Sequence, residues 1–89
     1  MRVRVRVFGL VQGVGFRYFV RESALSLMLK GWVRNAEDGS VEALFEGDED
    51  SIHRAVELCR MGPPMASVER VTVSPDSGDQ LPDDFRISD

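Results

Sequence analysis

Residues 9–17 read GLVQGVGFR and place three glycines and an arginine between a stretch with strand periodicity and a stretch with helical periodicity. Glycine reaches positive φ angles that other residues avoid, and the first N–H groups of a helix have no partner within the helix. Arg17 adds a permanent charge with a planar geometry that matches phosphate. These residues predict a cradle for an oxyanion at the start of a helix. The plain structural alternative is a glycine-rich connection followed by a surface arginine.

The position of Arg17 favours the cradle. A positive charge in the first turn of a helix opposes the helix dipole and costs roughly 0.3–1 kcal/mol unless an anion compensates it. A charge in such an unfavourable place, directly after a glycine-rich turn, is therefore better explained by a bound anion than by a solvated surface.

Hydrophobic periodicity divides the rest of the chain into strands and helices. Residues 2–8 alternate arginine with valine and predict a half-buried strand. Apolar residues then recur with helical spacing at Phe16, Val20, Ala24 and Leu27, so the cradle opens a helix. The other predicted elements are strands at 32–36 and 40–46 around a hairpin loop at 37–39, a helix that follows the acidic residues 48–50 and ends at 62–64, a strand at 67–74, and a short strand at 85–87.

The order of these elements predicts the fold class. A βαββαβ order with a short C-terminal strand is typical of an α+β ferredoxin-like two-layer sandwich, with two helices on one face of an antiparallel sheet. A strand–helix–strand crossover makes its two strands parallel, so their carboxyl ends lie at the same edge. Asn35 ends the second of these strands. It lies two residues after Val33, so the two side chains point to the same face of the sheet. If Val33 faces the core, Asn35 projects toward the cradle and Arg17.

Length and charge limit the classes of function. We expect residues 1–89 to form one domain. The net charge of −4 opposes a phosphate backbone, so we expect no nucleic-acid partner. No stretch approaches the roughly 20 apolar residues of a membrane span, and the alternating start does not resemble a signal peptide. We therefore expect no membrane association and a cytoplasmic location.

The chain contains one cysteine and one histidine. This pair cannot supply a disulfide framework or a zinc site within one chain. We therefore expect neither a metal nor another cofactor, and we expect a monomer.

Two segments together resemble a known family. Residues 9–17 match G-x-V-Q-G-V-x-F-R, and residues 31–47 match G-W-V-R-N-x-x-x-G-x-V-x-x-x-x-x-G. This pair resembles the two signatures of the acylphosphatases, and the resemblance extends over residues 2–87. It implies metal-free hydrolysis of the carboxyl-phosphate bond of small-molecule acyl phosphates to a carboxylate and inorganic phosphate.

The resemblance also implies roles for individual residues. In acylphosphatases the loop amides and the arginine bind the phosphoryl oxygens, and the asparagine positions the attacking water. By motif match, the implied catalytic residues are Arg17 and Asn35. The implied phosphate-binding residues, which would also hold inorganic phosphate or a similar anion, are Gln12, Gly13, Val14, Gly15, Phe16 and Arg17.

The sequence departs from the family pattern at two positions. Leu10 stands where the family often has a basic or polar residue, which implies a weaker positive potential around the cradle. Met28 stands where a glycine usually closes the first helix. If Met28 adopts the left-handed conformation there, it carries a strain of roughly 1–2 kcal/mol that glycine would avoid.

Two other classes of function stay open at this point. A non-catalytic anion-binding or regulatory module would keep the cradle without turning a substrate over. A ferredoxin-like RNA-binding domain would use the face that carries Arg2, Arg4 and Arg6, but the net charge and the lack of aromatic residues beside these arginines count against it. We interpret this arginine face as the solvated side of the sheet.

Single residues also have structural alternatives. The spacing of Asn35 is equally consistent with two roles. Its amide could form a structural hydrogen bond to the hairpin at the strand end, or it could have a functional role. The side chain of Gln12 is more suited to bracing the loop than to touching substrate. We expect an exposed His53 and a buried, inert Cys59. Trp32 should either cap the open sheet face or pack under the terminal strand.

Overall fold

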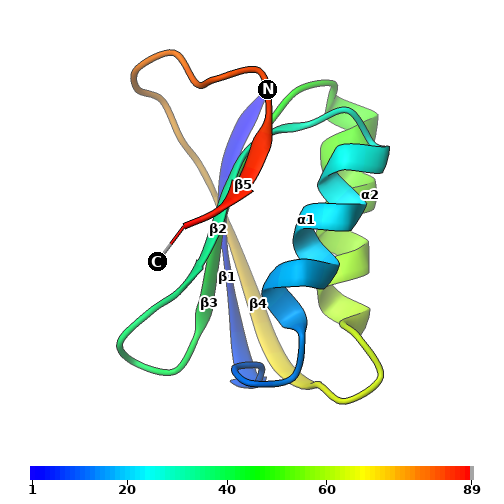
Figure 1. Ribbon diagram of the computed structural model, residues 1–89. Coiled ribbons are helices and arrows are strands. Elements are labelled where there is room, and N and C mark those ends of the chain that lie inside the picture. The colour runs from blue at the N-terminus through cyan, green and yellow to red at the C-terminus, as the bar shows by residue number, and fades with distance from the viewer. Residues whose placement is uncertain (89) are drawn as a thin grey trace.

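The computed structural model describes residues 1–88, which form a five-stranded sheet with two helices packed on one face (Figure 1). The elements in chain order are β1 (Arg2–Leu10), α1 (Phe16–Ser26), β2 (Lys30–Asn35), β3 (Val41–Glu46), α2 (Glu49–Met61), β4 (Ser67–Pro75) and β5 (Phe85–Ile87). This order and the single helix-covered face confirm the predicted ferredoxin-like sandwich.

The sheet has the strand order β4-β1-β3-β2-β5. Strand β3 pairs antiparallel with both β1 and β2, so β1 and β2 run parallel with β3 between them. Val41 of β3 is in register with Val7 on one side and with Asn35 on the other. The carboxyl ends of β1 and β2 therefore lie at the same edge, as the crossover rule predicted. The β1–α1 loop and the β2–β3 hairpin lie at the same end of the molecule (Figure 1).

The sheet differs from the expected antiparallel arrangement at one edge, where β5 pairs parallel with β2. Strand β4 lies at the opposite edge and runs antiparallel to β1, hence antiparallel to β2. A chain that reverses after β4 and crosses to the far edge must run parallel to β2. The long segment 76–84 permits this crossing, and the result is a mixed sheet.

The core lies between the sheet and the helices. The predicted alternation of β1 and the predicted helical stripes are confirmed, and Phe45 of β3 stacks on Phe85 of β5 with ring centroids 5.5 Å apart. The buried core residues of β1, α1 and α2 are Val3, Val5, Val7, Phe16, Val20, Ala24, Ile52, Ala55, Val56 and Cys59. Burial raises the pKa of the Cys59 thiol to about 12, and His53 is exposed, as expected. Neither helix within residues 1–88 combines the length and hydrophobicity needed to cross a membrane.

The open face of the sheet carries an ion-pair cluster centred on Glu42, whose exposed fraction is 1%. Its carboxylate accepts hydrogen bonds from Arg4 at 2.9 Å and from the Nε of Arg34 at 2.8 Å, and Arg6 lies 3.4 Å away. Burial raises the pKa of Glu42, but the hydrogen bonds from Arg4 and Arg34, together with the charges of Arg34 and Arg6, outweigh this effect and hold the pKa below its ordinary value. The arginine face is thus the open side of the sheet, as interpreted from the sequence, and its arginines in addition pair with a buried carboxylate.

The same cluster fixes the place of Trp32. The guanidinium carbons of Arg4 and Arg34 lie 5.4 and 5.1 Å from the centroid of its ring, within the range of cation–π contacts. Trp32 therefore caps the open face of the sheet, which was one of its two predicted positions.

Met28 adopts the left-handed conformation, with φ of 61°, and is the one non-glycine residue among residues 1–88 with positive φ. The N–H of Met28 donates to the carbonyl of Leu25 at 3.1 Å, and the N–H of Leu29 donates to that of Ala24 at 2.9 Å. These two bonds form a Schellman motif, which favours glycine at this position. The side chain of Met28 is 89% exposed, so packing does not offset the backbone strain.

We expect Met28→Gly to raise the free energy of unfolding by about 1 kcal/mol and the melting temperature by roughly 4–8 °C, with activity unchanged. Thermal unfolding followed by circular dichroism measures the effect. Met65 provides a matched control, because it is also an exposed methionine but has no positive φ. Met65→Gly should not raise the melting temperature. A melting temperature of Met28→Gly at or below that of the wild type would refute the strain.

Candidate active site

The cradle between β1 and α1 depends on two glycines. Gly13 and Gly15 have φ of 75° and 80°, and Gly15 is the N-cap of α1 in the left-handed conformation. A Cβ on either glycine would have no neighbouring atom within 4 Å. The requirement for glycine at these positions is therefore conformational, and the space in front of the turn stays open for a ligand.

The start of α1 has the electrostatic character predicted for an anion site. No side chain caps this helix terminus among residues 1–88, and its first turn contains no acidic residue. Arg17 is the second residue of the helix. The positive end of the helix dipole and the arginine charge thus lie at the same place, which favours a negatively charged ligand.

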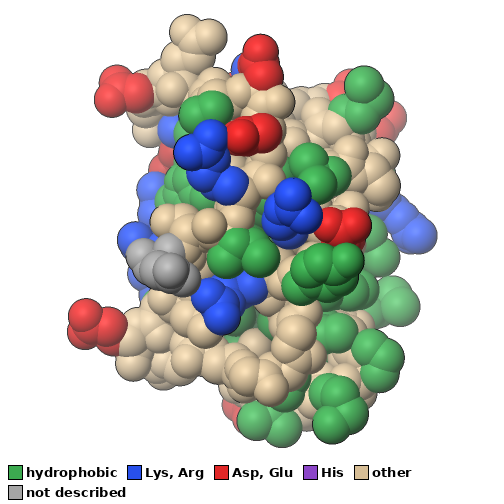
Figure 2. All heavy atoms as spheres, viewed as in Figure 1, with side chains coloured by type: hydrophobic (Ala, Val, Ile, Leu, Met, Phe, Trp, Pro, Cys, Tyr) green, Lys and Arg blue, Asp and Glu red, His purple; other side chains and the backbone are tan. Residues whose placement is uncertain are grey.

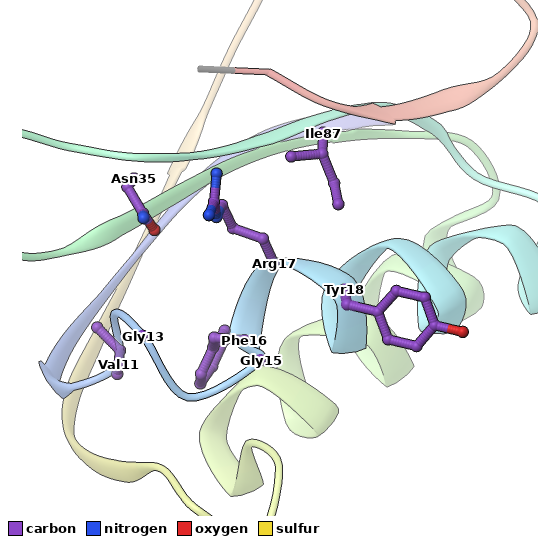
Figure 3. Close-up of a pocket in the computed structure, with 8 residues that line it drawn as sticks. All are labelled: Val11, Gly13, Gly15, Phe16, Arg17, Tyr18, Asn35 and Ile87. Atoms are coloured by element: carbon purple, nitrogen blue, oxygen red, sulfur yellow. The ribbon is translucent and has the colours of Figure 1, made fainter.

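A cavity of about 210 Å³ lies beside the cradle. In Figure 3 the Arg17 side chain extends into it from the start of α1, and the amide of Asn35 points toward Arg17 from the end of β2. The two sequence motifs therefore meet in space, as expected. The residues that line the cavity are Val11, Gly13, Gly15, Phe16, Arg17, Tyr18, Asn35 and Ile87.

Asn35 has an unsatisfied polar atom. Its Oδ1 is buried and has no hydrogen-bond partner among residues 1–88. Val33, two residues earlier in β2, is completely buried, which confirms the parity that directs Asn35 to the helix-covered side. Buried side-chain oxygens are paired in the large majority of cases, so an unpaired one at a cavity wall is suited to accept a hydrogen bond from a ligand or a water molecule.

The predicted phosphate-binding residues divide into two groups. Gly13, Gly15, Phe16 and Arg17 line the cavity, whereas Gln12 and Val14 do not. Val14 packs against the core. The Nε2 of Gln12 donates to the carbonyls of Ala36 at 2.8 Å and Ser40 at 3.0 Å, so its side chain braces the loop against the β2–β3 hairpin. Any contact of Gln12 or Val14 with an anion would therefore come from the backbone.

Three cavity-lining residues were missed in the sequence, namely Val11, Tyr18 and Ile87. Val11 and Tyr18 flank the predicted segment closely enough that a wider window would have included them. Ile87 lies in β5, and only the parallel pairing of β5 with β2 brings it to the site. Leu10, the departure from the family pattern, is 61% exposed and does not line the cavity.

The fold and the site define a ferredoxin-like α+β protein with a cavity at the start of α1 that is lined by two glycines, Arg17 and Asn35. The sequence model of the acylphosphatase family matches residues 3–87. An acylphosphatase of Rhizobium etli is 49% identical over 86 residues, which cover 97% of this chain and 92% of the relative. An acylphosphatase of Caldivirga maquilingensis is 51% identical over 79 residues, which cover 88% and 83% of the two chains.

Solved structures agree with these relatives. The crystal structure of acylphosphatase from Bacillus subtilis matches with a TM-score of 0.91 and 41% identity, and the match covers 98% of this chain and 97% of the other. The chain therefore belongs to the acylphosphatase family.

Proposed function

We propose that this protein is an acylphosphatase that hydrolyses the carboxyl-phosphate bond of acyl phosphates to a carboxylate and inorganic phosphate. The observation that carries the proposal is the meeting of the glycine cradle, Arg17 and Asn35 around one cavity. Membership of the acylphosphatase family supports the reaction class.

In this proposal the N–H groups of residues 12–17 and the guanidinium of Arg17 bind the phosphoryl oxygens. Both act on the charge that spreads over these oxygens in the transition state. The unpartnered Oδ1 of Asn35 accepts a hydrogen bond from a water molecule and holds it in line with the bond that breaks. The protein thus contributes positioning and electrostatic stabilisation.

The leaving group explains why such a site suffices. A carboxylate is a good leaving group, so the oxygen that departs does not need a proton from a general acid. Among the cavity-lining residues of the described chain there is no carboxyl, imidazole or thiol group, and the ring of Tyr18 points away from Arg17 (Figure 3). Within residues 1–88, no three His, Cys, Asp or Glu side chains are grouped so that they could hold a metal ion. We therefore propose a reaction that needs no metal.

The leaving-group argument predicts selectivity. We expect kcat/KM for benzoyl phosphate and carbamoyl phosphate to exceed that for glucose 6-phosphate by at least about 10²-fold. An alkoxide leaving group requires a general acid, and the cavity-lining residues within 1–88 include no carboxyl, imidazole or thiol group. Release of inorganic phosphate in the presence of EDTA measures the three substrates under one condition. Comparable turnover of the sugar phosphate would rule out the proposed basis of selectivity.

Two alternatives are less well supported. The comparisons do not favour a non-catalytic anion-binding module, since the relatives are named acylphosphatases and the sequence retains Arg17 and Asn35. The arginines of β1 pair with Glu42, Glu46 and Asp76, which leaves less positive charge for RNA. Figure 2 views the molecule from the side of β5, where basic side chains lie beside acidic and apolar ones.

A further inference from the structure

The side chain of Gln12 connects the two halves of the site. Gln12 belongs to the cradle loop, and its Nε2 donates to two carbonyl groups of the β2–β3 hairpin, that of Ala36 at 2.8 Å and that of Ser40 at 3.0 Å. Ala36 directly follows Asn35, and Ser40 directly precedes β3. A single amide group therefore holds both sides of the hairpin at the point where Asn35 enters the cavity.

The hairpin does not need these two bonds to close. The N–H of Ala36 donates to the carbonyl of Ser40 at 2.9 Å, and the N–H of Gly39 donates to the carbonyl of Ala36 at 3.2 Å. The carboxylate of Asp38 accepts further bonds from the N–H and the hydroxyl of Ser40 at 3.0 and 2.6 Å. Both carbonyls thus have backbone partners already, and what Gln12 adds is a fixed position of the hairpin relative to the cradle loop.

This relative position matters for the proposed reaction. The cradle and Arg17 hold the phosphorus atom, whereas the hairpin end holds Asn35 and the water. A displacement of about 1 Å between reacting groups can lower a rate by on the order of 10²-fold. The anion-binding groups themselves belong to the loop and to α1, and a change confined to the Gln12 side chain keeps the backbone N–H of residue 12.

We propose that Gln12 is a positioning residue that sets the separation between the phosphoryl group in the cradle and the water on Asn35. The inference rests on the proposed function. Its consequence is a separation of two effects: loss of the Gln12 donor lowers kcat but leaves the affinity of the cradle for phosphate nearly unchanged.

The test uses Gln12→Met, which keeps the length of the side chain and removes the donor. We expect kcat for benzoyl phosphate to fall by roughly 10- to 100-fold, and the inhibition constant of inorganic phosphate to change by less than about threefold. Gln80, an exposed residue of the segment between β4 and β5, provides the control, and Gln80→Met should behave like the wild type. All assays are run at a temperature where thermal unfolding shows each variant to be folded.

A double-mutant cycle with Asn35→Ala identifies the residue through which Gln12 acts. If Gln12 acts through Asn35, Gln12→Met should lower kcat little further in the Asn35→Ala background. The role would be overturned if Gln12→Met lowered kcat equally in the wild-type and Asn35→Ala backgrounds, or if it left kcat unchanged. It would also be overturned if the affinity for phosphate fell as much as kcat. If Gln12→Met does not fold, Gln12→Asn makes the same test, because its amide is one methylene too short to reach the carbonyls.

Failure of this inference can be told apart from failure of the proposed function. An inactive wild type would overturn the enzyme activity and the role of Gln12 together. An active wild type with an equally active Gln12→Met variant would overturn the role of Gln12 alone.

Discussion

Replacement of Arg17 by alanine should lower kcat/KM for benzoyl phosphate by on the order of 10³-fold and should weaken inhibition by inorganic phosphate. The guanidinium enters the cavity beside the glycine cradle, and no other cationic side chain lines that cavity within residues 1–88. Its removal takes away the charge that both the bound phosphate and the transition state require. Steady-state kinetics with phosphate as an inhibitor measures both losses.

Two variants make the interpretation of Arg17→Ala specific. Arg17→Lys keeps the charge but loses the planar pair of donors, so it should recover part of the phosphate affinity and little of kcat. Arg21 lies one turn further along α1 and pairs with Glu22 at 2.8 Å. Arg21→Ala should change kcat/KM by less than about threefold, because its charge is exposed and lies outside the cavity. An Arg17→Ala variant that retains a tenth or more of the activity would contradict the assigned role.

Replacement of Asn35 by alanine should lower kcat by on the order of 10²–10³-fold and leave the inhibition constant of phosphate nearly unchanged. The reason is that, in the proposed mechanism, Asn35 acts on the water and the cradle acts on the phosphate. The variant should not be less stable than the wild type, because the Oδ1 that it removes is buried without a partner. Kinetics and chemical denaturation of the same samples test both statements.

Arg34 is the neighbour of Asn35 in β2, and replacement of Arg34 should affect stability more than activity. Its side chain lies on the open face and contacts Glu42 at 2.7 Å. Arg34→Ala should therefore lower stability, because it removes a partner of a buried carboxylate, and should affect kcat much less than Asn35→Ala does. Equal losses of activity for the two alanine variants would contradict a specific role of Asn35.

The main features of the site could be predicted from the sequence because they follow from local rules. Alternation in β1, helical spacing from Phe16 and the strand–helix–strand crossover together fix which strand ends lie at the same end of the sheet. The parity of Asn35 with Val33 then selects the face. These steps need only near neighbours in the chain or one topological rule, and the structure confirms that Arg17 and Asn35 meet.

The features that were missed depend on pairings between distant segments. The parallel pairing of β5 brings Ile87 to the cavity, and no local pattern specifies to which edge a three-residue strand adds. The cluster around Glu42 depends on the register that aligns it with Arg6 and Arg34 across three strands. The hydrogen bonds of Gln12 cross from the loop to the hairpin. The residues that take part in these interactions are visible in the sequence, but the residues with which they pair are not.

The most direct test of the central claim is hydrolysis of benzoyl phosphate by the wild-type protein in EDTA and isotopically labelled water. We expect catalytic release of benzoate and inorganic phosphate in equal amounts, with the label in the phosphate, because in the proposed reaction the water held by Asn35 attacks phosphorus. Label in the benzoate would contradict the proposed geometry of attack. Binding of phosphate without turnover would contradict the proposed enzyme and would leave a binding module that carries the acylphosphatase motifs.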